Sequence, residues 1–478
     1  MSKIKKIINS IMIDNFEKEF LSRKDKIVLV QIVRGYYEFS LLEKTLKLEK
    51  INPEIKIVGL ESKLVYFSLL DYVLVVPFIA KSIINYLRKK KWRKLYKSIG
   101  VDFFISDRSF MFYWNFSDIN SLFNVFFKTK KKSQVLEIKI DNLYFGDLIY
   151  DTYIRYYYSP TIALLNFNFF SILFHSMGLI RNINKINNRY DVQLYIAQYT
   201  NYVNSGIPCR ILTNMDIRSI ALGNDLNIAK ELTQNDPKRA PNHQLYKERF
   251  NLMEDQGNKI KKGLERLNLR VSGNIDIVGM RNSSFSDSID TEFDKNIEGV
   301  IFLHDIFDAQ HMYEQFCFND LYEWTIFNLE LIRKEKLKIA VKPHINQKKE
   351  SLKIIEYLMK KYDDIHWIDS TTSNNVIFQN ISFGCTVFGT IITELAYNNI
   401  IPICCGDNPT SSFDYSYQAN SIEEYKDLIL NYRNLNFRPS KDEIGAFMYM
   451  HYDSNKHDKY KNIKLNRLDS DSKILKNL

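Results

Sequence analysis

The sequence is poor in cysteine and has none of the cysteine spacings that metal or redox sites use. It contains five cysteines among 478 residues, and no two of them form a CxxC pair. The count is odd, and three of the five lie in apolar runs typical of strands. This usage argues against a disulfide framework and a cysteine-based zinc site, and it indicates reduced core thiols in a cytoplasmic protein.

Several catalytic signatures are missing from the chain. It has no GxxxxGK[ST], HExxH or GxSxG motif, which argues against NTPases, zincins and the hydrolases that use these motifs. It also has no tandem repeat and no low-complexity tract. Its function therefore has to be inferred from the arrangement of ordinary strands and helices.

Uninterrupted apolar segments are also lacking. The first twenty residues have neither the long apolar stretch nor the cleavage site of a secretory signal. Apolar segments at 64–80 and 160–180 contain polar residues, so buried core helices explain them better than membrane spans. The first segment precedes a basic cluster with Trp92, and this order predicts peripheral attachment of Leu64 to Lys97 to an anionic membrane face, without a spanning helix.

The composition that is present indicates a folded protein of two domains. Hydrophobic residues make up 45% and charged residues 26% of a chain that is too long for one ordinary core. The net charge of +10 favours acidic partners, such as anionic lipid head groups or phosphorylated ligands. Because the lysine excess matches the coding bias of an AT-rich genome, we do not expect a nucleic-acid partner.

The N-terminal half begins with a strand–helix–strand pattern. Strand patterns at 26–33 and 55–62 flank a segment with helical spacing at 36–50, which predicts a parallel sheet. A further strand is expected at 101–107. Residues 191–214 are interpreted as a helix that stops at Gly206 and is followed by a strand.

The C-terminal half alternates strands with helices. The predicted strands lie at 299–305, 337–344, 365–369, 383–389 and 400–406, with helices at 319–336, 349–361, 372–380 and around Glu394. Such alternation is typical of a doubly wound α/β domain. The fold class predicted for the whole chain is therefore α/β, with two Rossmann-like domains facing a cleft.

The predicted domain boundaries follow changes in composition. Residues 1–270 form an N-terminal α/β domain on the acceptor side, and polar, charged residues lead to a linker at 271–294. Residues 295–435 form the C-terminal Rossmann-like domain. The tail at 436–478 is expected to pack back or to be partly mobile.

Polar residues follow every strand of the C-terminal series. In chain order, they are His304, Asp305, Asp308 and His311, then Lys342 and His344, then Asp369, Ser370 and Thr371, then Gly389, Thr390 and Glu394, and finally Gly406 and Asp407. In a doubly wound sheet, ligands bind beyond the carboxyl ends of the strands. The sequence therefore predicts a binding site along one edge of this sheet.

Each of these residues also has a purely structural explanation. Asp369 could cap a helix, Glu394 could complement a helix dipole, and His344 could be a buried structural histidine. As a set, however, they suit a nucleotide-linked sugar. The turn at Gly389 and Thr390 offers N–H groups to a phosphate, and Glu394 could accept hydrogen bonds from a ribose diol.

Lys342 and His344 could neutralise the charge that grows on a phosphate leaving group. If these two cations do that work, no metal is needed. We therefore expect neither a metal nor any other cofactor beyond the nucleotide-sugar co-substrate.

Three of these segments carry a family resemblance. "KPHI" (342–345), "GTIITE" (389–394) and "IPICCG" (401–406) resemble the C-terminal half of GT-B glycosyltransferases that build bacterial capsule and lipopolysaccharide O-chains. The resemblance covers about residues 295–430, and the N-terminal half is similar in general layout. A His-Pro pair marks CMP-sugar users such as sialic-acid and Kdo transferases, but here Ile345 replaces the proline.

The resemblance implies a nucleotide-sugar donor site in the C-terminal domain. The residues assigned to donor binding are His304, Asp305, Asp308, Lys342, Ser370, Thr371, Gly389, Thr390 and Glu394, with His344 acting in catalysis. A CMP-linked acidic sugar is one candidate donor.

The N-terminal domain is expected to hold the acceptor and, in an inverting enzyme, the catalytic base. Asp147 and Asp151 lie four residues apart and share a face if their segment is helical, which makes them the candidate bases. Alternatively, Asp151 simply pairs with Arg155 on a helix surface. Arg34 and Gly35, at the end of the first strand, are a second place that could face the cleft.

The predicted function is transfer of a sugar from a nucleotide-sugar donor to a growing bacterial surface glycan. The expected partners are that donor, a glycan or lipid-linked glycan acceptor and an anionic membrane surface, so the protein is placed at the inner face of the membrane. A nucleotide-sugar 2-epimerase would use the same fold and phosphate site without an acceptor. A non-catalytic scaffold that binds a glycan or lipid carrier would not need the polar strand ends.

Overall fold

A computed structural model describes residues 24–33, 35–61, 92–106, 116–223, 229–275, 282–286 and 293–454. The chain divides into two compact units. Unit 1 contains the described residues up to Arg239 except Tyr158–Thr161, and unit 2 contains Tyr158–Thr161 and the residues from Ala240 onward. Most of the predicted membrane-attachment region, as well as Arg34 and the tail beyond residue 454, lies outside the described residues.

Unit 1 is built on a six-stranded sheet, sheet A, in the order β3-β2-β1-β6-β7-β8. Its strands are β1 (Lys26–Ile32), β2 (Lys56–Glu61), β3 (Phe103–Ser106), β6 (Asp191–Ala197), β7 (Ser219–Leu222) and β8 (Ala229–Leu232). Every pair is parallel except β7 with β8. The predicted strand–helix–strand start is confirmed, since α2 (Tyr36–Glu49) connects β1 to β2.

The interpretation of residues 191–214 is wrong, because the two elements occur in the opposite order. The strand β6 comes first, and α9 (Val203–Asn214) follows with Gly206 and Pro208 inside it. Gly206 does not end the helix. It allows a close approach, since a Cβ at this position would lie 2.4 Å from the carbonyl oxygen of Thr200.

Unit 1 also contains four further described helices and a small hairpin. They are α5 (Phe116–Lys128), α6 (Lys132–Leu136), α7 (Gly146–Tyr157) and α8 (Phe167–Arg189), with the hairpin formed by β4 (Lys139–Ile140) and β5 (Leu143–Tyr144). The apolar segment at 160–180 contributes most of the buried face of α8, as predicted for a core helix. Among the described helices, none combines the length and apolar character needed to cross a membrane.

Unit 2 is built on a five-stranded parallel sheet, sheet C, in the order β10-β9-β11-β12-β13. The strands are β9 (Gly299–Phe302), β10 (Ile339–Lys342), β11 (Phe383–Thr386), β12 (Ile401–Cys404) and β13 (Tyr417–Gln418). The strand predicted at 365–369 is reduced to one bridge, between Trp367 and Val341. The alternating α/β pattern is otherwise confirmed.

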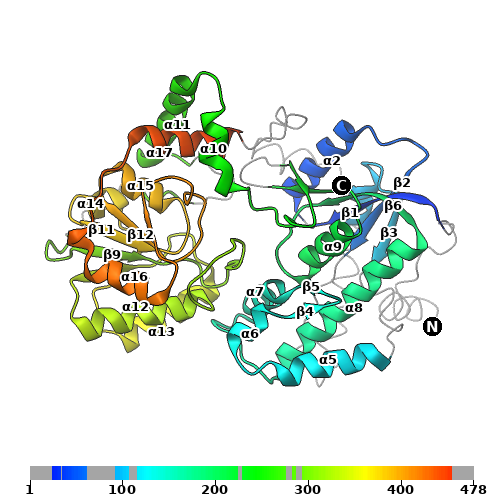
Figure 1. The fold of residues 1–478 in the computed structure, drawn as a ribbon, viewed down its shortest axis with the longest axis horizontal. Coiled ribbons are helices and arrows are strands. Elements are labelled where there is room, and N and C mark those ends of the chain that lie inside the picture. Colours follow the sequence, from blue (N-terminus) through cyan, green and yellow to red (C-terminus); the bar gives the residue numbers. More distant parts are fainter. Residues whose placement is uncertain are drawn as a thin grey trace. The chain divides into compact units, whose positions relative to one another are not determined.

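Helices cover both faces of sheet C. They are α12 (Leu321–Glu335), α13 (Lys349–Lys361), α14 (Asn374–Phe378), α15 (Ile391–Tyr397) and α16 (Ile422–Leu430). In the view of Figure 1, α12 and α13 lie below the sheet, and α14 and α15 lie above it. The burial of all four residues in each of β9, β10 and β11 follows from this three-layer arrangement.

Three more helices form a subgroup at the top of unit 2 in Figure 1: α10 (Tyr246–Asn251), α11 (Gln256–Val271) and α17 (Lys441–Tyr449). Glycines bring α11 and α17 together. A Cβ at Gly263 would lie 2.0 Å from the carbonyl oxygen of Gly445, so the two backbones approach more closely than side chains would permit. Short 3-10 helices at His243–Leu245 and Tyr432–Asn434 and a π-helix at Met450–Ser454 complete the unit.

Candidate functional site at the carboxyl edge of sheet C

The connections of sheet C reverse between β9 and β11, and we call the carboxyl ends of these two strands the crevice, after the usual ligand position in open α/β sheets. These strands are neighbours, but the chain continues from β9 to β10 on one side and from β11 to β12 on the other. Ligands of open α/β sheets bind outside the carboxyl ends of the strands at such a reversal. His304 follows β9, and Gly389 follows β11, so both predicted residues lie at this point.

His304 is held in one tautomer by the end of β11. Its Nε2 lies 2.9 Å from the hydroxyl oxygen of Thr386, and it accepts hydrogen bonds from the N–H groups of Val387 at 3.3 Å and Phe388 at 3.4 Å. A nitrogen that accepts from backbone N–H groups carries no proton, so the proton of the neutral ring is on Nδ1. The hydrogen bonds found for His304 among the described residues all involve Nε2, which leaves Nδ1–H as a donor.

The charge state of His304 follows from its surroundings. The rings of Phe388 and Trp324 lie 4.6 and 6.1 Å from it, centroid to centroid, and the residue as a whole is half-buried. Burial, together with the smaller effect of the charge of nearby His344, lowers the pKa of His304 to about 3. His304 is therefore a neutral hydrogen-bond donor at physiological pH.

Three other predicted residues lie near this point. Gly389 has a φ of 132°, a conformation that favours glycine, and a Cβ there would lie 3.7 Å from Cε1 of His304. Thr390 is half-buried beside it. His344, after β10, is exposed, and its Nδ1 accepts a hydrogen bond from the Asn346 N–H at 3.2 Å.

Glu394 lies inside unit 2 rather than on the surface of the strand ends. Its residue exposure is 4%, and its carboxylate lies 3.8 Å from the guanidinium of Arg270, which is 1% exposed. Lys342 is also buried and donates a hydrogen bond to the side-chain oxygen of Asn374 at 2.7 Å. The role of Glu394 in donor binding remains a prediction.

The pKa of Lys342 is lowered by its surroundings. Burial lowers its pKa to about 8, while the negative charges of Glu394 and Asp369 oppose that shift. We call Arg270, Lys342, Asn374 and Glu394 the internal charge cluster. The carboxylate of Glu394 is the negative charge of this cluster, and Arg270 and Lys342 are its two basic residues.

The acidic residues after β9 anchor the start of α13. Asp305 is buried and accepts hydrogen bonds from the Ser351 hydroxyl at 2.6 Å and the Phe307 N–H at 3.0 Å, and it pairs with Lys348 at 3.2 Å. Asp308 is exposed and pairs with the same lysine at 3.2 Å. These contacts connect the end of β9 to the neighbouring helix.

The residues after the 365–369 segment form a turn. Asp369 accepts hydrogen bonds from the N–H and the hydroxyl of Thr371, at 2.8 and 2.5 Å, and these bonds lower its pKa. The helix cap expected of Asp369 is instead made by Ser373, whose hydroxyl accepts from the Asn375 N–H. Ser370 is half-exposed, and Thr371 is exposed.

The candidate bases of unit 1 lie on α7, whose helical geometry places Asp147 and Asp151 on one face, as expected. Asp147 forms a two-pronged ion pair with Arg210, at 2.7 and 2.5 Å. Asp151 is 4% exposed. Their catalytic role remains a prediction.

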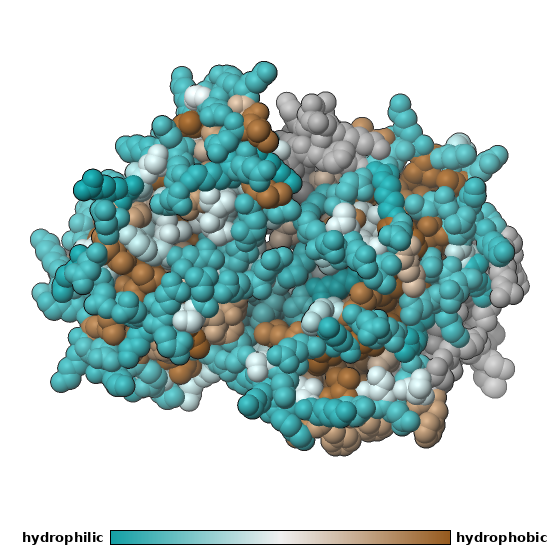
Figure 2. All heavy atoms as spheres, viewed as in Figure 1, coloured by the Kyte–Doolittle hydropathy of each residue, from teal (hydrophilic) through white to brown (hydrophobic). Residues whose placement is uncertain are grey.

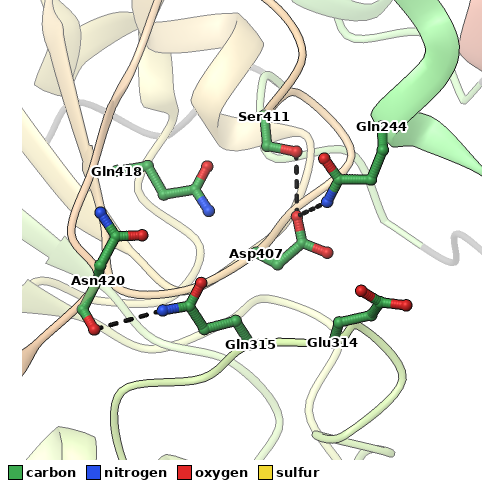
Figure 3. A pocket seen from close by; sticks show the side chains of 7 residues that line it. All are labelled: Gln244, Glu314, Gln315, Asp407, Ser411, Gln418 and Asn420. Atoms are coloured by element: carbon green, nitrogen blue, oxygen red, sulfur yellow. Dashed lines mark hydrogen bonds between the residues drawn. The ribbon is translucent and has the colours of Figure 1, made fainter.

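Sequence reasoning missed a polar pocket at the end of β12 and β13, shown in Figure 3. Its volume is about 340 Å³, and it is lined by Gln244, Glu314, Gln315, Asp407, Ser411, Gln418 and Asn420. Every lining side chain carries an amide, a carboxylate or a hydroxyl, and none is a lysine or an arginine. We call it the amide pocket.

Asp407 is the most buried residue of the amide pocket, with an exposure of 3%. Its carboxylate accepts hydrogen bonds from Gln244 at 2.8 Å and Ser411 at 3.0 Å, and Nε2 of His243 lies 2.9 Å from both oxygens. Although burial acts against it, the pKa of Asp407 is lowered because His243 and Ser411 hydrogen-bond the carboxylate. Nδ1 of His243 faces the carbonyl of Pro241 at 3.1 Å, so both ring nitrogens meet acceptors.

Aromatic rings connect the amide pocket to the crevice. Tyr313 lies 5.4 Å from the ring of His243 and 5.4 Å from that of Phe388, which in turn lies 4.6 Å from His304. The crevice and the pocket are therefore parts of one edge. Asp407 follows a predicted strand, which pointed to this edge, but His243 and Gln244 lie within residues 1–270, which were assigned to the N-terminal domain.

Within the described residues, no group of three or more histidine, cysteine, aspartate or glutamate side chains could hold a metal ion. The chemistry available from these residues is hydrogen bonding by a neutral imidazole, amides, carboxylates and a hydroxyl. Donors of this kind suit phosphate oxygens, and mixed donors and acceptors suit sugar hydroxyls.

Comparison with known proteins gives distant structural likenesses. No family model matches the sequence, and no curated protein matches it. A structure of Thermosulfurimonas dismutans KpsC, a beta Kdo 2,4 transferase, is 12% identical with a TM-score of 0.31, over 54% of this chain and 79% of that one. The UDP-GlcNAc 2-epimerase of Methanocaldococcus jannaschii, in complex with UDP-GlcNAc and UDP, is 11% identical with a TM-score of 0.29, over 88% and 97%.

A third likeness is to UDP-GlcNAc 2-epimerase from Neisseria meningitidis bound to UDP-GlcNAc, with 11% identity and a TM-score of 0.27 over 95% of this chain and 99% of that one. All three TM-scores are below 0.5. The α/β architecture of this chain is established by its own two sheets.

Proposed function

We propose that this protein is a glycosyltransferase that moves a sugar from a nucleotide-sugar donor to a growing bacterial surface glycan. The observation that carries the proposal is the carboxyl edge of sheet C. There, a fixed Nδ1–H donor at the strand reversal and a pocket of amides and carboxylates are connected by Phe388 and Tyr313.

In this proposal, the crevice receives the phosphates of the donor. When the bond between sugar and phosphate breaks, negative charge grows on the leaving phosphate oxygen. A hydrogen-bond donor that is already oriented toward that oxygen stabilises the transition state without having to reorganise. His304 supplies such a donor through Nδ1–H, and His344 is the exposed neighbour that can add positive charge when it is protonated.

The amide pocket would receive sugar hydroxyl groups. Amides and carboxylates donate to and accept from hydroxyls, whereas a sugar carboxylate would meet Asp407 and Glu314 with no lysine or arginine in the lining. The lining therefore favours an uncharged sugar over a CMP-linked acidic one. Asp147 and Asp151 remain the proposed candidates for the base that activates the acceptor, and no metal is required.

The proposal is tested by binding and by product analysis. Isothermal titration with UDP, GDP, CDP and CMP should identify one preferred nucleotide. The matching nucleotide-sugar, incubated with lipid-linked glycan acceptors and EDTA, should then release nucleotide and extend the glycan. Conversion of the nucleotide-sugar into an isomer without any acceptor would identify an epimerase instead, and absence of binding to all four nucleotides would refute both activities.

A further inference from the structure

One face of α5 exposes large apolar side chains to solvent. Phe116, Ile119, Phe123 and Phe127 are 78, 39, 44 and 56% exposed. Their spacing of three, four and four residues places them on a single face of the helix. We call these four residues the α5 stripe, and in Figure 2 apolar colour appears among hydrophilic residues at the lower edge of unit 1, where Figure 1 shows α5.

The helix α5 packs against α8. Phe123 lies 5.6 Å from Phe170 of α8, and Phe126 lies 5.4 Å from the same ring. Asp118, which is 1% exposed, accepts a hydrogen bond from Arg181 of α8 at 2.7 Å. Because these contacts hold α5 against α8, the exposed parts of the stripe form a preformed surface.

Positive charge adjoins the stripe at its C-terminal end. The chain continues from Phe127 as Lys128, Thr129, Lys130, Lys131 and Lys132. The first three of these lysines are exposed, and Lys132 is half-buried. Asp118 is the one acidic residue between 116 and 132, and it is paired inside.

Apolar side chains beside lysines match the surface of an anionic bilayer. A helix that lies in the interface buries its apolar face between the head groups and the acyl chains, while its lysines meet anionic head groups. A protein partner or a second copy of this chain could cover the apolar residues, but four adjacent lysines would then need an acidic surface opposite them. The charge pattern therefore favours lipid.

We propose that α5, through the α5 stripe and Lys128, Lys130 and Lys131, docks this protein on an anionic membrane surface. This site is separate in the chain from the Leu64 to Lys97 region that the sequence suggested. The inference does not depend on the proposed transferase activity, because it is tested by lipid binding alone.

The experiment is co-sedimentation of the full chain with vesicles of phosphatidylcholine alone or of phosphatidylcholine with one quarter phosphatidylglycerol. The protein should bind the anionic vesicles in 50 mM salt and lose most of that binding in 500 mM salt. Phe116→Ser combined with Phe127→Ser should reduce partitioning at least tenfold, and serine at Lys128, Lys130 and Lys131 should reduce it by a similar factor. Phe116 and Phe127 are the most exposed members of the stripe, so the fold should survive their replacement.

A matched control is available on α13, where Leu352 and Tyr357 are 41 and 57% exposed beside Glu350 and Glu356. Serine at Leu352 and Tyr357 should leave vesicle binding unchanged. Equal loss in this control, equal binding to neutral vesicles, or no binding to anionic vesicles at low salt would overturn the proposal. A concentration-dependent dimer that the Phe116 and Phe127 replacements abolish, seen by light scattering without vesicle binding, would assign the stripe to a second copy of the chain.

Discussion

Two buried carboxylates of unit 2 are almost equally inaccessible but lie in different settings. Glu394 and Asp407 are 4 and 3% exposed, and both lie beside a basic side chain, Arg270 and His243 respectively. Glu394 belongs to the internal charge cluster, whereas Asp407 forms part of the wall of an amide pocket. Two carboxylates that follow strands of the same sheet therefore differ in what surrounds them, and substitutions can compare their roles.

The largest expected effect concerns the internal charge cluster. Glu394→Gln removes a buried charge beside Arg270 and Lys342, and losing one partner of a buried ion pair costs about 3–5 kcal/mol. We expect the free energy of unfolding in urea to fall by about that amount, while the Kd for the preferred nucleotide changes less than threefold. Asp364→Asn, which breaks a surface pair with Arg333, is the control and should change stability little.

A result opposite to this expectation would assign Glu394, and not only Asp407, to the ligand site. If Glu394→Gln unfolds at the same urea concentration as the parent but binds nucleotide tenfold more weakly, Glu394 contacts the ligand. The internal charge cluster would then have to open when the donor binds.

The next effect concerns the crevice. His304→Ala removes the Nδ1–H donor, and loss of one oriented donor to a developing oxyanion lowers kcat by about 100- to 1,000-fold. His304→Asn keeps an N–H donor near the position of Nδ1 and should retain more activity. A rise in KM with kcat unchanged would instead mean that His304 binds the ground state and the transition state equally.

A smaller effect is expected in the amide pocket. Gln244→Ala removes one hydrogen bond to Asp407 and one polar group of the lining, for a loss of about 0.5–1.5 kcal/mol. We expect KM for the nucleotide-sugar to rise about threefold to tenfold, with the affinity for the free nucleotide unchanged. Gln256→Ala, outside the pocket, is the matched amide control. Equal weakening of sugar-linked and free nucleotide would exclude a sugar contact at this pocket.

The smallest expected effect is on the pH dependence of stability, which should differ between the internal charge cluster and the amide pocket. The pKa of Lys342 is about 8 in the folded protein and about 10.4 in an unfolded chain. Between these values the unfolded chain holds the extra proton, so this residue's contribution to stability should rise as pH increases from 8 to 10. Asp407 has a lowered pKa, so its contribution is present above about pH 4 and is lost as pH falls through its folded value.

Urea unfolding at several pH values measures both contributions. Lys342→Met should flatten the alkaline slope, and Asp407→Asn should flatten the acid slope. If either variant keeps the slope of the parent, the corresponding residue does not titrate as its surroundings indicate.

Much of the fold could be predicted because buried parallel strands have a simple signature. The apolar runs that became β1, β9 and β11 are short, continuous and separated by helical spacing, so their type and order follow from local pattern. The same reasoning gave the wrong order of helix and strand for residues 191–214. Gly206 and Pro208 are usual helix breakers, but α9 contains both, and at Gly206 the close backbone of Thr200 leaves no room for a Cβ.

The candidate site was harder to predict than the fold. The local sequence pattern identified the residues that follow the strands, including His304 and Gly389. These residues could be found because their place after a strand depends only on their position along the chain. The pattern could not separate Glu394 from Asp407, because the difference is made by Arg270 and His243, which lie more than a hundred residues away in sequence. The orientation of the His304 ring likewise depends on N–H groups of residues 387 and 388.

The contact between α11 and α17 has a mechanical consequence for unit 2. Unit 2 begins its long segment at Ala240 and ends it at Asn455, and these two helices lie near the two ends of that segment. The backbones of the two helices meet at Gly263 and Gly445. This contact joins the two ends of the chain segment that contains all of sheet C. Tension applied at the two ends of the segment would act on this helix contact before it reached any strand of sheet C.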